Sequence, residues 1–232
     1  MKRFTFSGAF SSLQRRLLVL LVVALLPVFG YFMASSVAQQ RESLEQAKLG
    51  VQAVSSLNAL GVERTVEGAH QLLNAVSNGP FLRGHGDKAQ CTEFLTGIGR
   101  DYPHYSNLAV LELDGNLICG ESGTTAGANF ADRVPFQEAV RTRSFAIGGY
   151  QMGQINDKPS MAFVMPILDK QGVLSGAAMV ALDLSYLQSG LEGPKQAEMR
   201  VSVTDRNGII LASDGLHSGA VGARLTDQRQ LG

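Results

Sequence analysis

From Leu17 the chain is apolar almost without interruption for 18 residues, and the next charged residue is Arg41. A helix of about 20 apolar residues crosses the hydrocarbon layer of a bilayer, so this pattern predicts a transmembrane helix over residues 17–38. Residues 1–16 carry four basic and no acidic side chains. Because positively charged segments stay on the cytoplasmic side, we expect a cytoplasmic N-terminus and a periplasmic location for everything from Arg41 onward.

The same apolar run has an alternative interpretation as a cleaved signal peptide. Ser36, Val37 and Ala38 form an acceptable small-residue cleavage site before Gln39. A signal peptide usually contains an apolar stretch of about 7–15 residues, and the stretch here is longer. The length favours an uncleaved anchor, and both interpretations export the remainder of the chain.

Behind this run, the spacing of the apolar positions becomes helical. Between residues 39 and 77 they recur at steps of three and four, as on one face of an α-helix. The clearest stripe consists of Val62, Val66, Ala69, Leu73 and Val76. Asn78, Gly79 and Pro80 then form a strong stop signal. The sequence therefore predicts a long exported helix in the segment 39–78, whose stripe packs on a core and on a second helix.

Beyond the stop, turn signals separate shorter segments. The alternating run 107–113 is followed by Asp114-Gly115-Asn116, which predicts a β-hairpin. Asp169-Lys170-Gln171-Gly172 is a second turn signal between two long predicted strands. The expected elements are a helix at 91–102, the hairpin, a helix after Pro135 within 130–144, and strands that include 160–169 and 173–187. This mixture predicts an α+β fold with an antiparallel sheet.

The pattern of residues 110–119 returns at 201–213: an alternating run, an Asp-containing turn and a second apolar run. We therefore expect one complete module over 79–190 and the beginning of a second module over 191–232. The second module stops after its first hairpin, so we expect that the sequence is a piece of a longer protein.

Charge and chemistry exclude several classes of function. The chain has 20 basic and 20 acidic residues, and beyond residue 16 the balance is 16 to 20. Such a chain is unsuited to holding nucleic acid through phosphate contacts. The four histidines are scattered, and no nucleophile elbow, phosphate loop or paired-carboxylate motif occurs. We expect no catalytic residue, cofactor or metal, and hence no enzyme in this chain.

Three runs carry a resemblance to a known family: Ala-Asp-Arg-x-x-Phe at 131–136, Tyr-Gln-x-Gly with Lys-Pro-Ser at 150–160, and Ala-Leu-Asp-Leu at 181–184. These runs follow the predicted anchor and long helix in the sequence. Together they resemble the extracytoplasmic double Cache sensor domains of bacterial receptors, over about residues 40–232. The resemblance implies a PAS-like antiparallel-sheet module that lies between two helices in the inner membrane. A ligand in the membrane-distal module then shifts the long helix and an output domain in the cytoplasm.

The resemblance also implies the class of protein and its partners. It implies the input region of a sensor histidine kinase in a two-component system, with a diguanylate cyclase or phosphodiesterase as the alternative output. A secreted solute-binding module is a further alternative. The expected partners are a small organic ligand, the membrane, and a second copy of the chain that pairs through the long helix.

Cys91 and Cys119 are the only cysteines. An even number of cysteines in an exported domain favours a disulfide. This bond would close a loop of about 27 residues and stabilise the fold by roughly 3–4 kcal/mol. Two buried free thiols are the alternative.

Arg133 is the sharpest candidate for contact with a ligand. In Cache modules that bind amino acids, an Arg is followed by Trp and Tyr at the second and third positions, and an Asp lies on a later strand. The resemblance therefore implies ligand-binding roles for Arg133 and Asp183, and a guanidinium suits a carboxylate because it donates two parallel hydrogen bonds. Pro135 and Phe136 replace the Trp and Tyr, which leaves open a carboxylate ligand without an amine. The alternative is a local ion pair between Arg133 and Asp132.

Three further side chains are weaker candidates for the same site. Tyr150 lies on a segment expected to face Arg133 across the pocket, Lys158 lies near the same rim, and Tyr105 lies at a helix–strand junction. A tyrosine offers an apolar ring and a polar tip, which suits the lining of a pocket. The alternative for each is a plain surface or core role. The complete predicted ligand set is Arg133, Tyr150, Asp183, Phe136, Lys158 and Tyr105.

Overall fold

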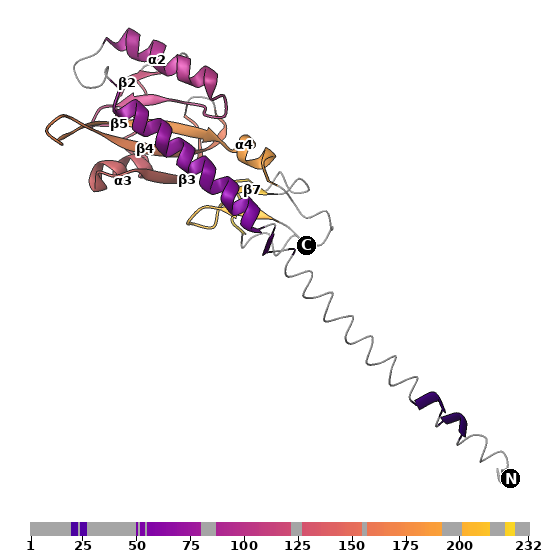
Figure 1. Cartoon of the computed structure of the whole chain (residues 1–232). Helices are drawn as coiled ribbons and strands as arrows, with labels where there is room; N and C mark the ends of the chain where they lie inside the picture. The colour runs from indigo at the N-terminus through magenta and orange to yellow at the C-terminus, as the bar shows by residue number, and fades with distance from the viewer. Residues whose placement is uncertain are drawn as a thin grey trace, which may run out of the picture. The chain divides into compact units, whose positions relative to one another are not determined.

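The computed structural model divides the chain into two compact units, residues 1–53 and 54–232 (Figure 1). It describes residues 20–22, 24–26, 50, 52–53, 55–79, 87–121, 127–154, 157–191, 201–213 and 221–225. The described residues of the first unit are helical. The predicted cytoplasmic segment 1–16 and most of the predicted membrane helix 17–38 lie outside the described residues. Of the helices that are described, none is both long and apolar enough to cross a membrane.

In the second unit, the predicted long helix is present over residues 55–77, and we call this element the N-terminal helix. The expected stripe is buried or partly buried in the core: Val62, Val66, Ala69, Leu73 and Val76. The helix ends at the predicted stop, where the N–H of Gly79 donates to the carbonyl of Val76 (2.9 Å). The helical prediction is confirmed here, and its part over 39–49 lies outside the described residues.

A five-stranded antiparallel sheet forms the centre of this unit, in the strand order β2-β1-β5-β4-β3. Its strands are β1 (Ala109–Leu111), β2 (Leu117–Gly120), β3 (Ala146–Met152), β4 (Pro159–Leu168) and β5 (Leu174–Asp183). Strand β1 pairs with β2 and β4 pairs with β5, each across a turn that the sequence predicted. The α+β fold with an antiparallel sheet is therefore confirmed.

Helices cover both faces of the sheet (Figure 1). One face, which includes Phe163, packs against the N-terminal helix, α2 (Lys88–Asp101) and α4 (Leu184–Ser189). The other face, which includes Met179, packs against α3 (Val134–Thr142). We call the second surface the α3 face. Because neighbouring residues of a strand point to opposite faces, each strand supplies both cores.

The expected echo of the first hairpin is present as β6 (Ser202–Thr204) and β7 (Ile210–Ser213), which pair antiparallel. The turn chemistry is also repeated. A carboxylate oxygen of Asp114 accepts the N–H of Asn116 (3.0 Å), and one of Asp205 accepts the N–H of Asn207 (2.8 Å). Such Asx turns fix a tight reversal of the chain.

The predicted disulfide is confirmed. Cys91 on α2 and Cys119 on β2 are bonded, and their Cα atoms lie 6.1 Å apart. Leu95, one helical turn after Cys91, is buried on the same side of α2. The disulfide therefore fastens α2 to an edge strand of the sheet.

One predicted element ends earlier than expected. The strand predicted over 173–187 stops at Asp183, and the chain continues as the short helix α4. The Asp183 carboxylate accepts the N–H of Ser185 (2.8 Å), which is the usual cap at a helix start. Leu184 and Leu187 are both buried, and their spacing of three suits a helix rather than a strand. The prediction of strand over 184–187 is wrong for this reason.

Candidate ligand-binding site

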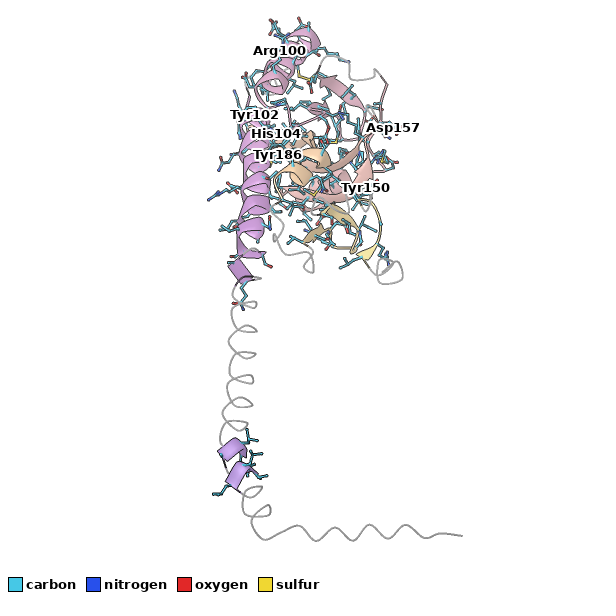
Figure 2. The ribbon with its side chains drawn as sticks, turned by 90° about the vertical axis from the view of Figure 1, so that its right-hand side faces the viewer. Arg100, Tyr102, His104, Tyr150, Asp157 and Tyr186 are labelled. Atoms are coloured by element: carbon cyan, nitrogen blue, oxygen red, sulfur yellow. A yellow bond between two sulfur atoms is a disulfide. The ribbon has the colours of Figure 1, made fainter. Side chains whose placement is uncertain are left out.

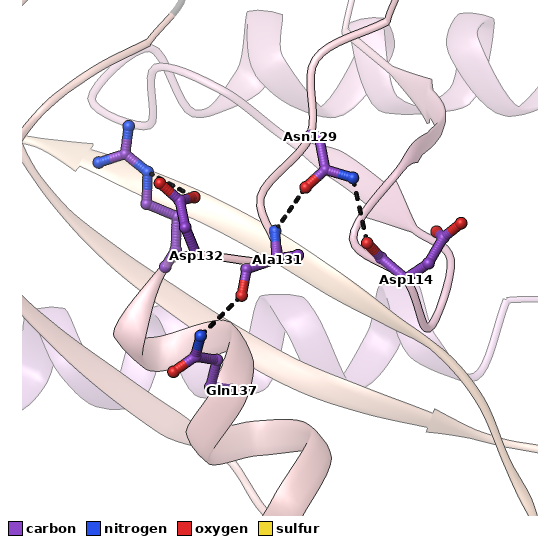
Figure 3. Close-up of polar contacts among 6 residues, drawn as sticks. Asp114, Asn129, Ala131, Asp132 and Gln137 are labelled. Carbon is purple, nitrogen blue, oxygen red and sulfur yellow. Dashed lines mark hydrogen bonds and ion pairs between the residues drawn. The ribbon is translucent and has the colours of Figure 1, made fainter.

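Side-chain amides hold the segment before α3 against the β1–β2 turn. Asn129 uses both ends of its amide: Nδ2 donates to the carbonyl of Asp114 (3.0 Å), and Oδ1 accepts the N–H of Ala131 (2.9 Å). Gln137 on α3 donates to the carbonyl of Ala131 (2.9 Å). Figure 3 shows this series of contacts from Asp114 to Gln137. They fix the backbone directly before Arg133.

The β1–β2 turn requires glycine at position 115. Its φ of +83° lies in the region that side chains disfavour. A β-carbon there would also overlap the backbone nitrogen of Ala131. The N–H of Phe130 donates to the carbonyl of Gly115 (2.9 Å). The turn and the segment before α3 thus pack backbone to backbone, and this close packing sets the position of Arg133.

Arg133 is the cap residue immediately before α3. Its Nε is buried and has no hydrogen-bond partner among the described residues. Asp132 forms a long ion pair with it, in which Oδ1 lies 3.8 Å from Nε. That distance is too great for a hydrogen bond, and the Asp132 side chain is 76% exposed. Since a buried donor without an acceptor is costly, the Nε is a group that an incoming acceptor would satisfy.

Arg133 borders a small cavity on the α3 face of the sheet. Polar groups in its lining come from Asn107, Gln151 and Ser160, and apolar groups come from Phe130, Met179 and Ala181. The cavity volume is about 20 Å³, which is room for about one water molecule. An organic ligand would therefore have to enlarge the cavity.

Asp183 and Lys158 do not line this cavity. Asp183 pairs with Ser160 across β4 and β5 and so shares its face of the sheet. A carboxylate oxygen of Asp183 lies 3.4 Å from Nζ of Lys158. Burial alone would raise the pKa of Asp183, but hydrogen bonds from Ser185 and the charge of Lys158 outweigh burial, and the pKa lies below its usual value. A charged carboxylate and its lysine partner therefore lie beside Ser160, which lines the cavity that Arg133 borders.

Tyr150 does not reach the cavity, contrary to expectation. Ile147 pairs with Phe163 and Tyr150 pairs with Met161, so β3 uses three residue steps where β4 uses two. Such a β-bulge reverses which side chains face each side of a strand. Tyr150 consequently packs in the core on the face opposite to α3 and Arg133.

The bulge instead connects β3 to the second hairpin. The N–H of Tyr150 donates to a carboxylate oxygen of Asp205 (3.1 Å). A side chain at Gly149 would overlap that carboxylate, and one at Gly222 would overlap the Tyr150 ring. Tyr150 therefore contacts the second hairpin and lies one residue before the cavity residue Gln151.

Phe136 and Tyr105 are buried core residues, and neither lines the cavity. Phe136 packs between α3 and the sheet. Tyr105 lies on the opposite face and forms a bridge with Leu182. Burial, assisted by the neighbouring Tyr186 and Tyr102, raises the pKa of Tyr105 to about 12. Both residues are observed in packing positions, which for Tyr105 is the alternative that the sequence left open.

The polar residues Asn107, Gln151 and Ser160 of the cavity were not among the predicted site residues. Asn107 lies two residues before β1, and Gln151 and Ser160 are cross-strand partners on β3 and β4. Ser160 is fully buried. A polar side chain at an inward position of a strand was the available signal. Within the described residues, no three His, Cys, Asp or Glu side chains are grouped so that they could hold a metal ion.

No protein-family model matches this chain, and no curated protein matches it. Solved structures do match. The ligand-binding domain of the amino-acid chemoreceptor PctC from Pseudomonas aeruginosa PAO1, in complex with GABA, is 18% identical with a TM-score of 0.60, over 75% of this chain and 79% of that one. The sensor domain of the histidine kinase DctB from V. cholerae is 15% identical with a TM-score of 0.61, over 77% and 73%.

A third match is a domain of a sensory box/GGDEF family protein from Vibrio parahaemolyticus. It is 13% identical with a TM-score of 0.54, over 70% of this chain and 69% of that one. At these identities the likeness shows the fold. The chain has the fold of Cache-type extracellular sensor domains, and the expected PAS-like architecture is confirmed.

Proposed function

We propose that the chain is the periplasmic, ligand-sensing input region of a membrane-bound bacterial signalling protein, and that Arg133 holds a carboxylate of its ligand. The fold, which is shared with sensor domains of a chemoreceptor and a histidine kinase, supports the first part. The observation that carries the second part is the buried Nε of Arg133, which borders a cavity and has no hydrogen-bond partner among the described residues.

A carboxylate suits this place because both of its oxygens can accept from one guanidinium. Hydrogen bonds to charged groups contribute about 1.5–3 kcal/mol, which corresponds to roughly tenfold to a hundredfold in affinity. Asn107, Gln151 and Ser160 supply further hydrogen-bonding groups from the same lining. The apolar wall then selects the remainder of the ligand.

Ligand entry has to enlarge the cavity, whose volume is about 20 Å³. Binding is therefore coupled to movement of its lining, which includes Gln151 on β3. The adjacent Tyr150 is hydrogen-bonded to Asp205 of the second hairpin. This connection supports a route by which the site communicates with the second module.

Asp183 is the proposed partner of an amine, if the ligand carries one. Its carboxylate already pairs with Lys158, so a ligand ammonium would replace the lysine. GABA, the ligand in the chemoreceptor structure, carries both a carboxylate and an amine. A ligand without an amine would leave the Lys158–Asp183 pair intact.

The topology and the transducer type are part of the same proposal. Residues 1–16 lie in the cytoplasm, 17–38 span the inner membrane, and residues from 41 onward are periplasmic. A sensor histidine kinase is our first choice, and a diguanylate cyclase or phosphodiesterase is the alternative, since a GGDEF protein shares the fold. Leu57 and Leu60 are exposed on the N-terminal helix, which supports pairing of two copies through this helix.

The test is calorimetric titration of the full chain in lipid nanodiscs with GABA, L-serine, acetate and succinate. For each carboxylate that binds, Arg133→Ala should weaken binding about tenfold to a hundredfold. Arg133→Lys should rescue only partly, because an ammonium does not reproduce the planar fork. Melting temperatures of the variants report folding separately.

Asp132→Asn is the matched control. If Arg133 serves only the local ion pair, Asp132→Asn and Arg133→Ala should lower stability alike and leave the affinity of folded protein unchanged. If Arg133 binds the ligand, only the Arg133 variants should lose affinity. Unchanged affinity in folded Arg133→Ala protein, or no binding of any carboxylate, would contradict the proposal.

A further inference from the structure

A second cavity lies between the N-terminal helix and α4, on the face of the sheet opposite to Arg133. Gly61, Val62 and Thr65 line it from the helix, and Tyr186, Leu187 and Leu191 line it from α4 and the residues after it. Its volume is about 210 Å³. An apolar cavity of about 150 Å³ is large enough to admit benzene. This second cavity therefore has room for a small aromatic molecule without rearrangement.

The lining is largely apolar, its polar groups come from Asn58, Thr65, Tyr186 and Ser189, and among the described residues no charged side chain contributes to it. The Tyr186 ring forms one wall of the cavity. It is held in place by stacking on the His104 ring, with the two ring centroids 4.5 Å apart. Burial lowers the pKa of His104, so this imidazole is neutral at pH 7. Figure 2 shows Tyr102, His104 and Tyr186 gathered beside the N-terminal helix. Because no charge lines this space, it disfavours an ion.

Two hydroxyl groups in the lining can accept hydrogen bonds from a ligand. Thr65 Oγ1 donates to the carbonyl of Gly61 (2.9 Å), and Ser189 Oγ, also in the lining, donates to the carbonyl of Tyr186 (2.8 Å). Each hydroxyl proton is therefore engaged, and the oxygen lone pairs remain to accept. A ligand with an N–H or O–H donor can therefore use the Thr65 and Ser189 oxygens.

Gly61 adds to the available space. A β-carbon at this helical position would meet no atom within 4 Å. Because Gly61 lines the cavity, we expect a larger side chain at position 61 to take up part of that space. One substitution at position 61 can thus block the site. Replacing a glycine inside a helix does not disfavour the helix.

We propose that this cavity is a binding site for a small, uncharged aromatic molecule with one N–H or O–H donor. The proposal does not depend on carboxylate binding at Arg133. A ligand here touches the N-terminal helix and α4 at once. Helix α4 is in turn bonded to β7, since Gln188 Oε1 accepts the N–H of Ser213 (3.0 Å). A ligand at this site could therefore change how the N-terminal helix, α4 and the second hairpin pack against one another.

Indole is a suitable probe, with 1-methylindole as the matched compound that lacks the donor. We would titrate each into the full chain in lipid nanodiscs and follow the assigned methyl signals of Val62, Leu187 and Leu191 by NMR. Indole should give saturable shifts of these signals, and 1-methylindole should bind severalfold more weakly. Arg133→Ala should leave both results unchanged, which separates this site from the carboxylate site.

Gly61→Leu should raise the dissociation constant of indole at least tenfold. Gly97→Leu is the matched control, because position 97 is also helical and open, and it should bind as the wild type does. The methyl spectrum of each variant verifies that it is folded. Shifts that rise linearly without saturation, normal binding by Gly61→Leu, or equal binding of the two probes would overturn the proposal.

Discussion

Loss of the Cys91–Cys119 disulfide should destabilise the protein by an amount that its loop length sets. The two cysteines are 28 residues apart. In the chain-entropy description, a cross-link over such a loop removes about 12 cal/mol/K from the unfolded state, or about 3.5 kcal/mol at 25 °C. For a domain of this size, that loss corresponds to a fall in Tm of about 7–14 °C.

The assay compares thermal unfolding of the oxidised full chain with that of protein reduced while unfolded and then refolded in dithiothreitol. The double variant with Cys91→Ala and Cys119→Ala is measured with and without the same reductant. It should have a Tm close to that of the reduced wild type, and reductant should not change it. A fall in Tm of less than about 2 °C would refute the reasoning, since the cross-link would then contribute under 1 kcal/mol. An equal effect of reductant on the cysteine-free variant would refute it as well.

Three other predictions follow from single positions. Gly115→Ala should destabilise by about 2 kcal/mol or more, because its positive φ disfavours a side chain and the β-carbon would overlap the backbone of Ala131; urea unfolding measures this. The pKa of Asp183 is lowered, so the contribution of its carboxylate to folding stability is present above pH 3.8 and is lost as pH falls below that value. In measurements of Tm against pH, Asp183→Asn should reduce the fall in Tm at acidic pH. The pKa of Tyr105 is raised to about 12, so the contribution of its neutral hydroxyl to folding stability is present below pH 10 and is lost as pH rises toward 12. Tyr105→Phe should remove this fall in Tm at alkaline pH.

Local signals were sufficient to predict most of the fold. The stripe of the N-terminal helix and the Asp-Gly turn at residue 114 depend on residues close in sequence, and their structures follow the predictions. The disulfide also followed, since two cysteines allow only one pairing. The end of β5 was harder, because the apolar run continues past Asp183 and only a capping carboxylate marks the change to a helix.

Of the six residues predicted to bind a ligand, Arg133 is the one that borders the cavity. Alternation along β3 would place Tyr150 on the α3 face, but after the bulge at 148–149 the side chains point to the opposite faces of the sheet. The reason for that bulge lies far away in sequence, in the Asp205 carboxylate that the Tyr150 N–H meets. Ser160 was not predicted because a polar residue within a strand resembles a solvent-facing position until the tertiary packing is known, and Asn107 was not predicted because it precedes β1.

The most direct test of the carboxylate site observes the Arg133 side chain itself. Nitrogen–proton NMR spectra of arginine side chains contain one Nε–H signal for each arginine, and Arg133→Lys identifies the signal of Arg133. In the free protein this N–H is buried and has no acceptor within the part of the chain that the structure describes. When the carboxylate found by calorimetry saturates the chain, the Nε proton of Arg133 should shift downfield as it gains a charged acceptor. A saturated protein in which the Arg133 signal stays at its free position would contradict the account.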